Sequence, residues 1–156
     1  MPETLRLALV RQVLLTEIMD LRYRVLRPGL PLEEARFPGD ELATTWHVGA
    51  FLSEEEGVPP ACCASFMLNR FQNKVAWQLR GMATEPKQQR LGLGKAVLDW
   101  AEREIAQQSG IRTLWCNARV SAAPFYEKLG WQFKSGEFEI PTAGSHREMA
   151  KVVRAA

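Results

Sequence analysis

Apolar and polar residues alternate along the first stretch of the chain and then change period. The alternating run Leu5–Val10 predicts a first strand. Over Thr16–Leu26 the apolar residues return every three or four positions, which predicts a helix with Thr16 as its N-cap. Residues 27–45 are acidic and rich in turn-forming residues, and they predict a long loop with room for one helical turn.

The middle of the chain predicts three strands joined by polar turns. The strands are expected at Trp46–Leu52, Ala61–Leu68 and Ala76–Thr84, with turns at 53–60 and 69–74. The second of these strands is almost wholly apolar. It is therefore expected to lie in the centre of a sheet, covered on both faces.

The second half of the chain returns to helical periodicity. Apolar residues repeat at four-residue spacing through a predicted helix at Ala96–Gln108. After it we expect a strand at Arg112–Ala118, a short helix at Ser121–Lys128 capped by Ser121, and an antiparallel pair formed by Trp131–Ile140 and His146–Val153. The order βα(α)βββαβαββ favours an α/β (α+β) fold with a single mixed, mostly antiparallel sheet flanked by helices, in one domain spanning residues 1–156.

Composition excludes several classes of partner. The 156 residues are 46% hydrophobic and 24% charged, with a net charge of +2, which gives no case for nucleic acid or a membrane surface as partner. No apolar run approaches the roughly 18 residues of a membrane helix, and the N-terminus lacks a secretory apolar region. Cys62, Cys63 and Cys116 are odd in number and lack metal-ligand spacing. We expect reduced, buried thiols, a cytoplasmic location and no metal.

The segment Gln89–Lys95 carries the first chemical signal. It reads Gln-Arg-Leu-Gly-Leu-Gly-Lys and lies between a predicted strand and a predicted helix. The N-terminus of a helix presents unpaired backbone N–H groups and the positive end of the helix dipole, so this segment predicts an anion site, most naturally for phosphate. Gly92 and Gly94 let a ligand approach the backbone, while Arg90 and Lys95 add positive charge. A simple helix entry is the alternative.

Three nucleotide-binding motifs compete for this segment. A dinucleotide fingerprint needs a third glycine where Val97 stands, and a Walker loop needs serine or threonine where Ala96 stands. The pattern Gln-x-x-Gly-x-Gly instead resembles the pyrophosphate loop of the GNAT superfamily of acyl-coenzyme A N-acyltransferases. Met82–Pro86 is similar to the fourth strand of that family, and Phe125–Trp131 is similar to its Phe-Tyr-Glu-Lys-Leu-Gly-Phe block. The resemblance covers about residues 46–153.

This resemblance implies acetyl-coenzyme A as the acyl donor, without a metal. In the family the fourth and fifth strands splay apart, and the backbone of the fourth pairs with the pantetheine arm. Here that implies Met82, Ala83 and Thr84, with the Met82 N–H as the candidate oxyanion donor. The pyrophosphate would lie on N–H groups from Arg90 to Lys95. The full set implied to bind the cofactor is Met82, Ala83, Thr84, Gln89, Arg90, Leu91, Gly92, Leu93, Gly94, Lys95, Asn117 and Phe125.

Tyr126 matches the family tyrosine that faces the thioester sulfur and protonates the leaving thiolate. We therefore expect Tyr126 to be the catalytic acid, with its position mattering more than its pKa. The family commonly has asparagine seven residues before this tyrosine, where this chain has Arg119. Asn117, two residues earlier on the same strand face, is the substitute candidate.

The general base is left open at this stage. Some family members carry a glutamate on the fourth strand, but Gln78 and Arg80 occupy that stretch here and cannot accept a proton. His47, His146, Glu85 and an ordered water are the alternatives. His47, His146 and Arg80 are also candidate acceptor-site residues. Trp46-His47 together with His146-x-x-Met149 is similar to an ElaA-like branch of the superfamily.

The expected acceptor is a primary amine on a small molecule or a peptide. A polyamine, an amino sugar, a peptide N-terminus and a lysine are not distinguished by the residue types. We expect the 27–45 loop and the 136–146 hairpin to shape the acceptor pocket. The acidic residues Glu33, Glu34, Asp40 and Glu41 suggest attraction for a cationic amine, with a solvated surface as the alternative. A monomer or a homodimer is expected, and the competing function is a non-catalytic acyl-coenzyme A sensor.

Overall fold

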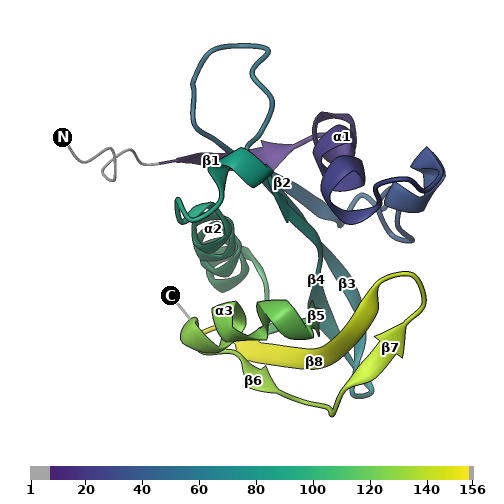
Figure 1. Ribbon diagram of the computed structural model, residues 1–156. Helices are drawn as coiled ribbons and strands as arrows, with labels where there is room; N and C mark the ends of the chain where they lie inside the picture. Colours follow the sequence, from purple (N-terminus) through teal and green to yellow (C-terminus); the bar gives the residue numbers. More distant parts are fainter. Residues whose placement is uncertain (1–7, 155–156) are drawn as a thin grey trace.

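The computed structural model describes residues 8–154, whose strands form one mixed sheet (Figure 1). The strand order is β1-β2-β3-β4-β5-β8-β6, and β7 also pairs with β8. The strands are β1 (Leu9–Val13), β2 (Trp46–Phe51), β3 (Cys62–Phe71), β4 (Lys74–Thr84), β5 (Thr113–Arg119), β6 (Gln132–Phe133), β7 (Phe138–Ile140) and β8 (Gly144–Val152). Every pairing is antiparallel except that of β4 with β5. The predicted mixed, mostly antiparallel sheet is therefore confirmed.

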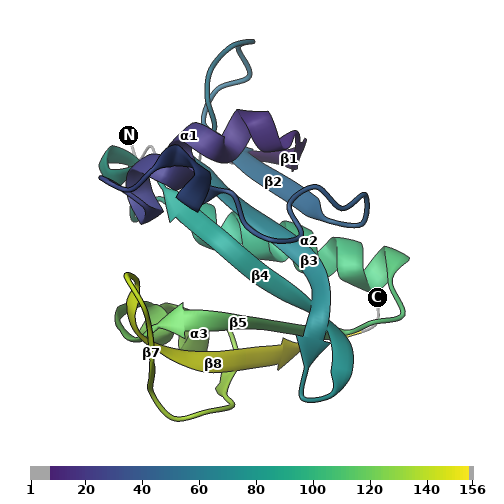
Figure 2. The same cartoon turned by 90° about the vertical axis from the view of Figure 1, so that its right-hand side faces the viewer.

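Helices cover both faces of this sheet, as Figures 1 and 2 show. The helices are α1 (Leu15–Leu26), α2 (Leu93–Gln108) and α3 (Ala123–Lys128), with short 3-10 turns η2 (Leu32–Ala35), η3 (Pro86–Gln88) and η4 (Val120–Ala122). Successive side chains of a strand point to opposite faces. Accordingly Cys62 packs into the core under α2, whereas Cys63 packs with Ile18 and Leu21 of α1. The apolar run on β3 thus reflects a strand covered on both faces, as the sequence predicts.

The start of α1 differs from the prediction. Of the predicted first strand, Leu5–Leu7 lie outside the described residues, and β1 extends to Val13. The helix begins at Leu15, so Thr16 is not its N-cap. Instead the carboxylate of Glu17 accepts the N–H of Leu14 at 2.7 Å. Glu17, an acidic side chain in the first turn, thus satisfies the N–H of the N-cap residue itself, and no side chain caps the first turn as the predicted threonine would.

Two later boundaries also differ. Ser121 is exposed and lies within η4; α3 begins after it, with Ala122 at the N-cap, so the predicted Ser121 cap is wrong. The predicted strand at Trp131–Ile140 is divided into β6 and β7. Between them the Ser135 hydroxyl accepts the backbone N–H of Glu148 at 2.9 Å, so a side chain takes over a hydrogen bond of the strand ladder.

A β-bulge on β4 precedes the point where the sheet divides. The pairing of β3 with β4 runs from Cys63↔Ala83 to Ser65↔Arg80, which leaves two residues of β4 opposite one residue of β3. Gly81, the first of those two, has φ +65°, a backbone conformation that favours glycine. The bulge re-aims the strand just before Met82.

Strands β4 and β5 pair in parallel over only two residue pairs, Trp77↔Leu114 and Gln78↔Trp115. Both strands then continue, β4 to Thr84 and β5 to Arg119, and they diverge (Figure 2). The splay that the family resemblance implies is therefore present. It leaves backbone groups of both strands without a partner in the ladder, facing the gap between them.

A buried ion pair attaches the 27–45 segment to α1. Arg22 of α1 is fully buried, and its guanidinium donates to Asp40 at 2.6 Å and 3.1 Å. It also donates to Ser65 at 2.7 Å and to the carbonyl of Ala35, in η2, at 2.8 Å. The helical turn expected in this loop is thus present as η2, and the loop is a tethered part of the structure.

Removing the carboxylate of Asp40 is expected to lower the free energy of unfolding by about 3–5 kcal/mol, because it leaves a buried guanidinium without its counter-charge. The measurement is chemical denaturation of Asp40→Ala against the unsubstituted protein. The matched control is Asp20→Ala, which breaks the exposed pair of Asp20 with Arg24 and should cost under about 1 kcal/mol. Equal losses in the two variants would contradict the assignment.

The three cysteines are free and buried, as expected from the sequence. Burial raises the pKa of the Cys62 thiol to about 11 and the pKa values of Cys63 and Cys116 to about 12. The folded protein should therefore resist a thiol reagent such as Ellman's reagent at pH 8 and react fully only in denaturant. Because the unfolded thiols ionise at lower pH than the folded ones, the thiols' contribution to stability should be fully present below pH ~9 and be lost as the pH rises toward 12. Rapid reaction of the native protein would overturn this prediction.

Candidate active site

A cavity of about 210 Å³ lies where β4 and β5 separate. Its walls come from the end of α1, the 27–45 loop, β4 around the Gly81 bulge, β5 from Cys116 onward, α3 and the β7–β8 hairpin. The two segments expected to border an acceptor, 27–45 and 136–146, both line it. The fold thus brings together residues that are more than a hundred positions apart in the sequence.

The predicted phosphate segment lies at the N-terminus of α2. Gly92 is the N-cap with φ +77°, and an added Cβ there would meet no atom within 4 Å. Arg90, just before it, also has a positive φ of 66° and an exposed side chain. The first N–H groups of α2, from Leu93 to Lys95, have no acceptor within the helix. An open approach, free N–H groups and the positive helix end make this an anion-binding geometry.

The side chains of this segment differ in what they can offer. Gln89 and Leu91 are exposed, whereas Leu93 is 3% exposed and packs in the core, which leaves only its backbone for a ligand. Lys95 donates to Asp99 at 2.7 Å, an exposed pair one turn along the helix. Its charge is therefore partly matched already, and Arg90 is the more available cation.

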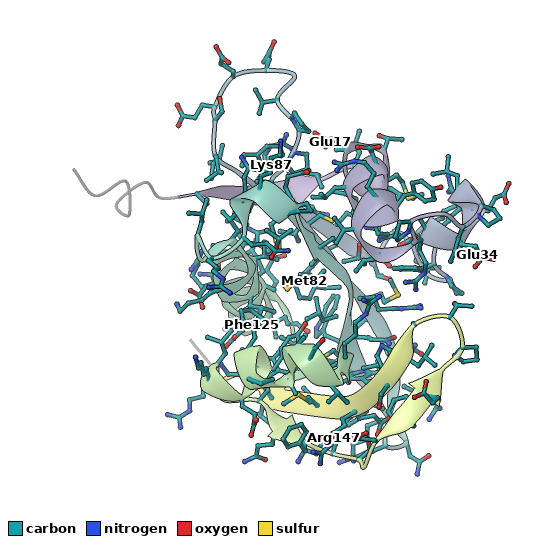
Figure 3. The ribbon with its side chains drawn as sticks, in the orientation of Figure 1. Glu17, Glu34, Met82, Lys87, Phe125 and Arg147 are labelled. Atoms are coloured by element: carbon teal, nitrogen blue, oxygen red, sulfur yellow. The ribbon has the colours of Figure 1, made fainter. Side chains whose placement is uncertain are left out.

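Gly94 has a packing role as well. A Cβ at this position would lie 3.2 Å from the Phe125 ring and 3.4 Å from the Met82 sulfur. Figure 3 shows Met82 and Phe125 between β4 and the helices α2 and α3. The absent side chain thus lets the start of α2 come close to the end of β4 and to α3, and it brings three predicted cofactor residues into contact.

The remaining predicted cofactor residues lie along the two diverging strands. On β4, Ala83 is buried opposite Cys63, and the Thr84 hydroxyl donates to the Cys62 sulfur at 3.3 Å. Neither side chain reaches the cavity, so any role toward a ligand falls to their backbone groups. On β5, Asn117 lines the cavity and is exposed.

Tyr126 comes from α3 and lines the inner wall of the cavity, 7% exposed. Its ring contacts those of Phe125 and Trp131, each with a centroid separation of 5.0 Å. Burial, with the neighbouring Cys116 thiol as hydrogen-bond partner, raises the pKa of the Tyr126 hydroxyl well above its ordinary value. The phenol is therefore held protonated, as a proton donor must be.

His146 of β8 lies on the same cavity, 4% exposed. Its Nδ1 is 2.7 Å from the carbonyl oxygen of Gly144. Since a carbonyl can only accept, Nδ1 carries the proton, and in the neutral ring Nε2 keeps a lone pair. His146 thus has the form that a general base requires.

The other base candidates are engaged elsewhere. His47 is buried with both ring nitrogens occupied, Nδ1 by the Ser65 hydroxyl at 2.6 Å and Nε2 by the Asp40 carbonyl oxygen at 2.8 Å. It does not line the cavity, and it helps to hold the Asp40 loop. Glu85 accepts two hydrogen bonds from Arg24, which lowers the pKa of its carboxyl. Of the protein groups considered, the structure brings only His146 to the cavity.

One wall of the cavity is cationic. Arg27, Arg80 and Arg119 line it, and no aspartate or glutamate of the described chain does so. Burial is the largest cause that lowers the pKa of Arg27, and repulsion from Arg119 is the second. Burial is also the largest cause that lowers the pKa of Arg80. Arginine nevertheless stays charged, so like charges converge here without a carboxylate.

The suggested attraction between the acidic loop and a cationic amine stays a prediction for Glu33 and Glu34, which are exposed and do not line the cavity. Asp40 forms a buried ion pair with Arg22, and Glu41 pairs with Arg36 at the surface.

Of the arginines that line the cavity, Arg80 was identified from the sequence, whereas Arg27 was missed. Its only sequence signal is its place directly before Pro28, where α1 ends and the side chain can turn toward the loop.

Within residues 8–154, no group of three or more histidine, cysteine, aspartate or glutamate side chains is placed to hold a metal ion. Over the same residues, no helix is long and apolar enough to cross a membrane.

Known proteins share both the sequence and the fold. A family model described as "Acetyltransferase (GNAT) domain" matches residues 47–133. The N-acetyltransferase YitI of Bacillus subtilis (strain 168) is 30% identical over 145 residues, which cover 93% of this chain and 96% of YitI.

Solved structures agree at the level of the fold. Escherichia coli ElaA superposes with a TM-score of 0.73 at 11% identity, covering 93% of this chain and 99% of ElaA. An aminoglycoside 6'-N-acetyltransferase complexed with coenzyme A gives 0.71 at 14% identity, covering 95% and 98%. The ribosomal-protein-S18-alanine N-acetyltransferase of E. coli gives 0.69 at 21% identity, covering 96% of both chains.

The expected family is thus confirmed by sequence, and the likeness to ElaA is borne out in the fold. Together with the splayed strands and the glycine-bearing start of α2, these matches show that the chain is an acyltransferase of the GNAT N-acetyltransferase family.

Proposed function

We propose that this enzyme transfers an acetyl group from acetyl-coenzyme A to the primary amine of a small acceptor that also carries an anionic group. Donor and acceptor would meet in one ternary complex at the cavity between β4 and β5. The observation that carries the acceptor assignment is the wall of three arginines without a lining carboxylate.

The donor side supports coenzyme A. The diphosphate would lie on the N–H groups of Leu93, Gly94 and Lys95 with Arg90 beside it, and Gly92 leaves space for it. The pantetheine arm would run along the diverging β4, where Met82–Thr84 offer backbone groups at the gap. Acetyl-coenzyme A supplies the thioester, and backbone dipoles with a cation meet the negative charge without a metal.

The acceptor side supports an anionic amine. Like charges repel one another, so gathering Arg27, Arg80 and Arg119 on one wall is unfavourable by itself. A carboxylate or phosphate group on the acceptor would offset that repulsion and accept paired hydrogen bonds from guanidinium groups. A polyamine or an aminoglycoside would add to the repulsion.

In the proposed reaction His146 Nε2 takes the proton of the amine, and the neutral nitrogen attacks the thioester carbonyl. A C–N bond forms, the C–S bond breaks, and Tyr126 donates its proton to the leaving sulfur. Burial raises the pKa of Tyr126, so the phenol keeps its proton until a thiolate forms beside it, and the proposed donation depends on its position rather than on its acidity.

Separate losses are expected for the two proton-transfer residues. Tyr126→Phe should lower kcat by roughly 10²–10⁴-fold while coenzyme A affinity stays within about twofold. His146→Gln should lower kcat/KM by a similar factor and remove the acidic limb of its pH profile, since that limb reports protonation of the base. The release of free thiol, measured as a function of pH, gives the kinetic constants of both variants. His47→Gln is not a suitable control because it disturbs the Asp40 loop. A Tyr126→Phe enzyme with full activity would remove the acid role, and an unchanged pH profile in His146→Gln would remove the base role.

Matched amines test the acceptor class. At saturating acetyl-coenzyme A, kcat/KM should be at least about tenfold higher for O-phosphoethanolamine than for ethanolamine, and higher for β-alanine than for propylamine. The expected factor follows from the ~1.5–3 kcal/mol of a hydrogen bond to a charged group. Arg80→Gln should reduce the preference, whereas Arg103→Gln, at an exposed site on α2, should not. Equal rates within each pair, or faster reaction of spermidine, would contradict an anionic acceptor.

A further inference from the structure

One aromatic ring lies in the middle of the arginine cluster. The guanidinium carbon of Arg22 is 4.3 Å from the centroid of the Phe37 ring, that of Arg80 is 4.7 Å away, and that of Arg27 is 5.2 Å away. All three distances are within the roughly 6 Å over which a cation is attracted to an aromatic ring. Phe37 also lines the cavity, and it is 8% exposed.

The three arginines differ in their other partners. The Arg22 side chain donates to Asp40, Ser65 and the Ala35 carbonyl through its two terminal nitrogens, while its Nε has no partner, and it does not line the cavity. Among the hydrogen bonds of the described residues, the guanidinium of Arg27 donates only to the carbonyl of its neighbour Leu26, at 2.9 Å.

Arg80 reaches only the carbonyl of Pro38, at 3.5 Å, by the same criterion. Neither Arg27 nor Arg80 is paired with a carboxylate among residues 8–154. The Phe37 ring is the contact that these two cavity-lining groups share, while the charges of Glu34 and Asp40 act on Arg27 and Arg80 without pairing with them.

Phe37 is itself held in place from two sides. Its N–H donates to the buried carboxylate of Asp40 at 2.7 Å, so the ion pair with Arg22 fixes the backbone that carries the ring. On the other side, an added Cβ on Gly81 would lie 3.0 Å from the ring and 2.9 Å from Arg22. The bulge glycine thus makes room for the ring and the guanidinium to lie against β4.

We propose that Phe37 is a positioning residue for the acceptor: its ring holds the guanidinium groups of Arg27 and Arg80 side by side so that both can bind the anionic group. This inference rests on the proposed anionic acceptor and adds a residue to it. Without the ring, the two like-charged side chains would spread into solvent, and an anion would have to gather them again on binding. Phe37 touches neither the reacting amine nor the thioester in this account, so its effect should fall on acceptor binding rather than on the chemical step.

The test compares Phe37→Leu, Phe37→Tyr and the control Leu32→Ala, an exposed position on η2 in the same loop. The first probe is inorganic phosphate, titrated calorimetrically into each protein saturated with coenzyme A. Phe37→Leu should weaken phosphate binding by roughly tenfold, in line with the loss of two partly buried cation–π contacts. Phe37→Tyr and Leu32→Ala should each stay within about twofold of the unsubstituted protein.

The second readout is steady-state kinetics with O-phosphoethanolamine. Phe37→Leu should raise KM by a similar factor with kcat changed by less than about twofold, while Phe37→Tyr restores the original KM. Coenzyme A affinity of each variant reports whether it is folded. A fall in kcat with unchanged KM, or no rescue by tyrosine, would assign the ring a purely structural role and overturn the inference.

The outcomes separate this inference from the proposed function. If the unsubstituted protein bound no phosphate and showed no preference for anionic amines, the acceptor assignment would fail, and the role of Phe37 with it. If the unsubstituted protein bound phosphate and Phe37→Leu bound it equally well, only the positioning role would fail.

Discussion

The early end of the parallel pairing between β4 and β5 is the constraint on which the site depends. Two residue pairs hold the strands together, and beyond them both strands continue without each other. A sheet that stayed closed would leave no cavity and would use the backbone groups that face the gap. The bulge at Gly81 and α3 border this opening, and the start of α2 packs beside it through Gly94 against Met82 and Phe125, so the proposed donor and acceptor surfaces adjoin one another.

The positive potential on the two sides of the opening comes from different groups. On the donor side, positive potential comes mainly from backbone N–H groups at the start of α2, with the exposed cation of Arg90. On the acceptor side it comes from guanidinium groups, which must be held together against their own repulsion. The buried Arg22–Asp40 pair anchors the loop, and the loop delivers Phe37 to the other arginines. The unfavourable free energy of gathering like charges is thus offset by the rigid, hydrogen-bonded structure around the Arg22–Asp40 pair.

Local sequence patterns predicted much of this fold and the proposed donor half of the site. Periodicity identified most helices and strands, and the glycine spacing around Gly92 with the Phe125–Trp131 block pointed to the family. The predicted N-caps at Thr16 and Ser121 are wrong. Helix α1 begins at Leu15, where Glu17 accepts the N–H of Leu14, and Ser121 lies within a 3-10 turn. For the other half of the site, the sequence predicted the two bordering segments together with Arg80 and His146, but not the arginine cluster. Asp40 looked like a surface acid until Arg22, eighteen positions away, was seen to neutralise it, and Arg27 gave no signal beyond a proline beside it.

The most direct measurement is a crystal structure of the protein with coenzyme A. The account predicts the pantetheine arm between β4 and β5, the diphosphate on the N–H groups of Leu93–Lys95, and the sulfur within hydrogen-bonding distance of the Tyr126 hydroxyl. Coenzyme A bound on another surface, or a sulfur remote from Tyr126 with the gap between the strands closed, would contradict it.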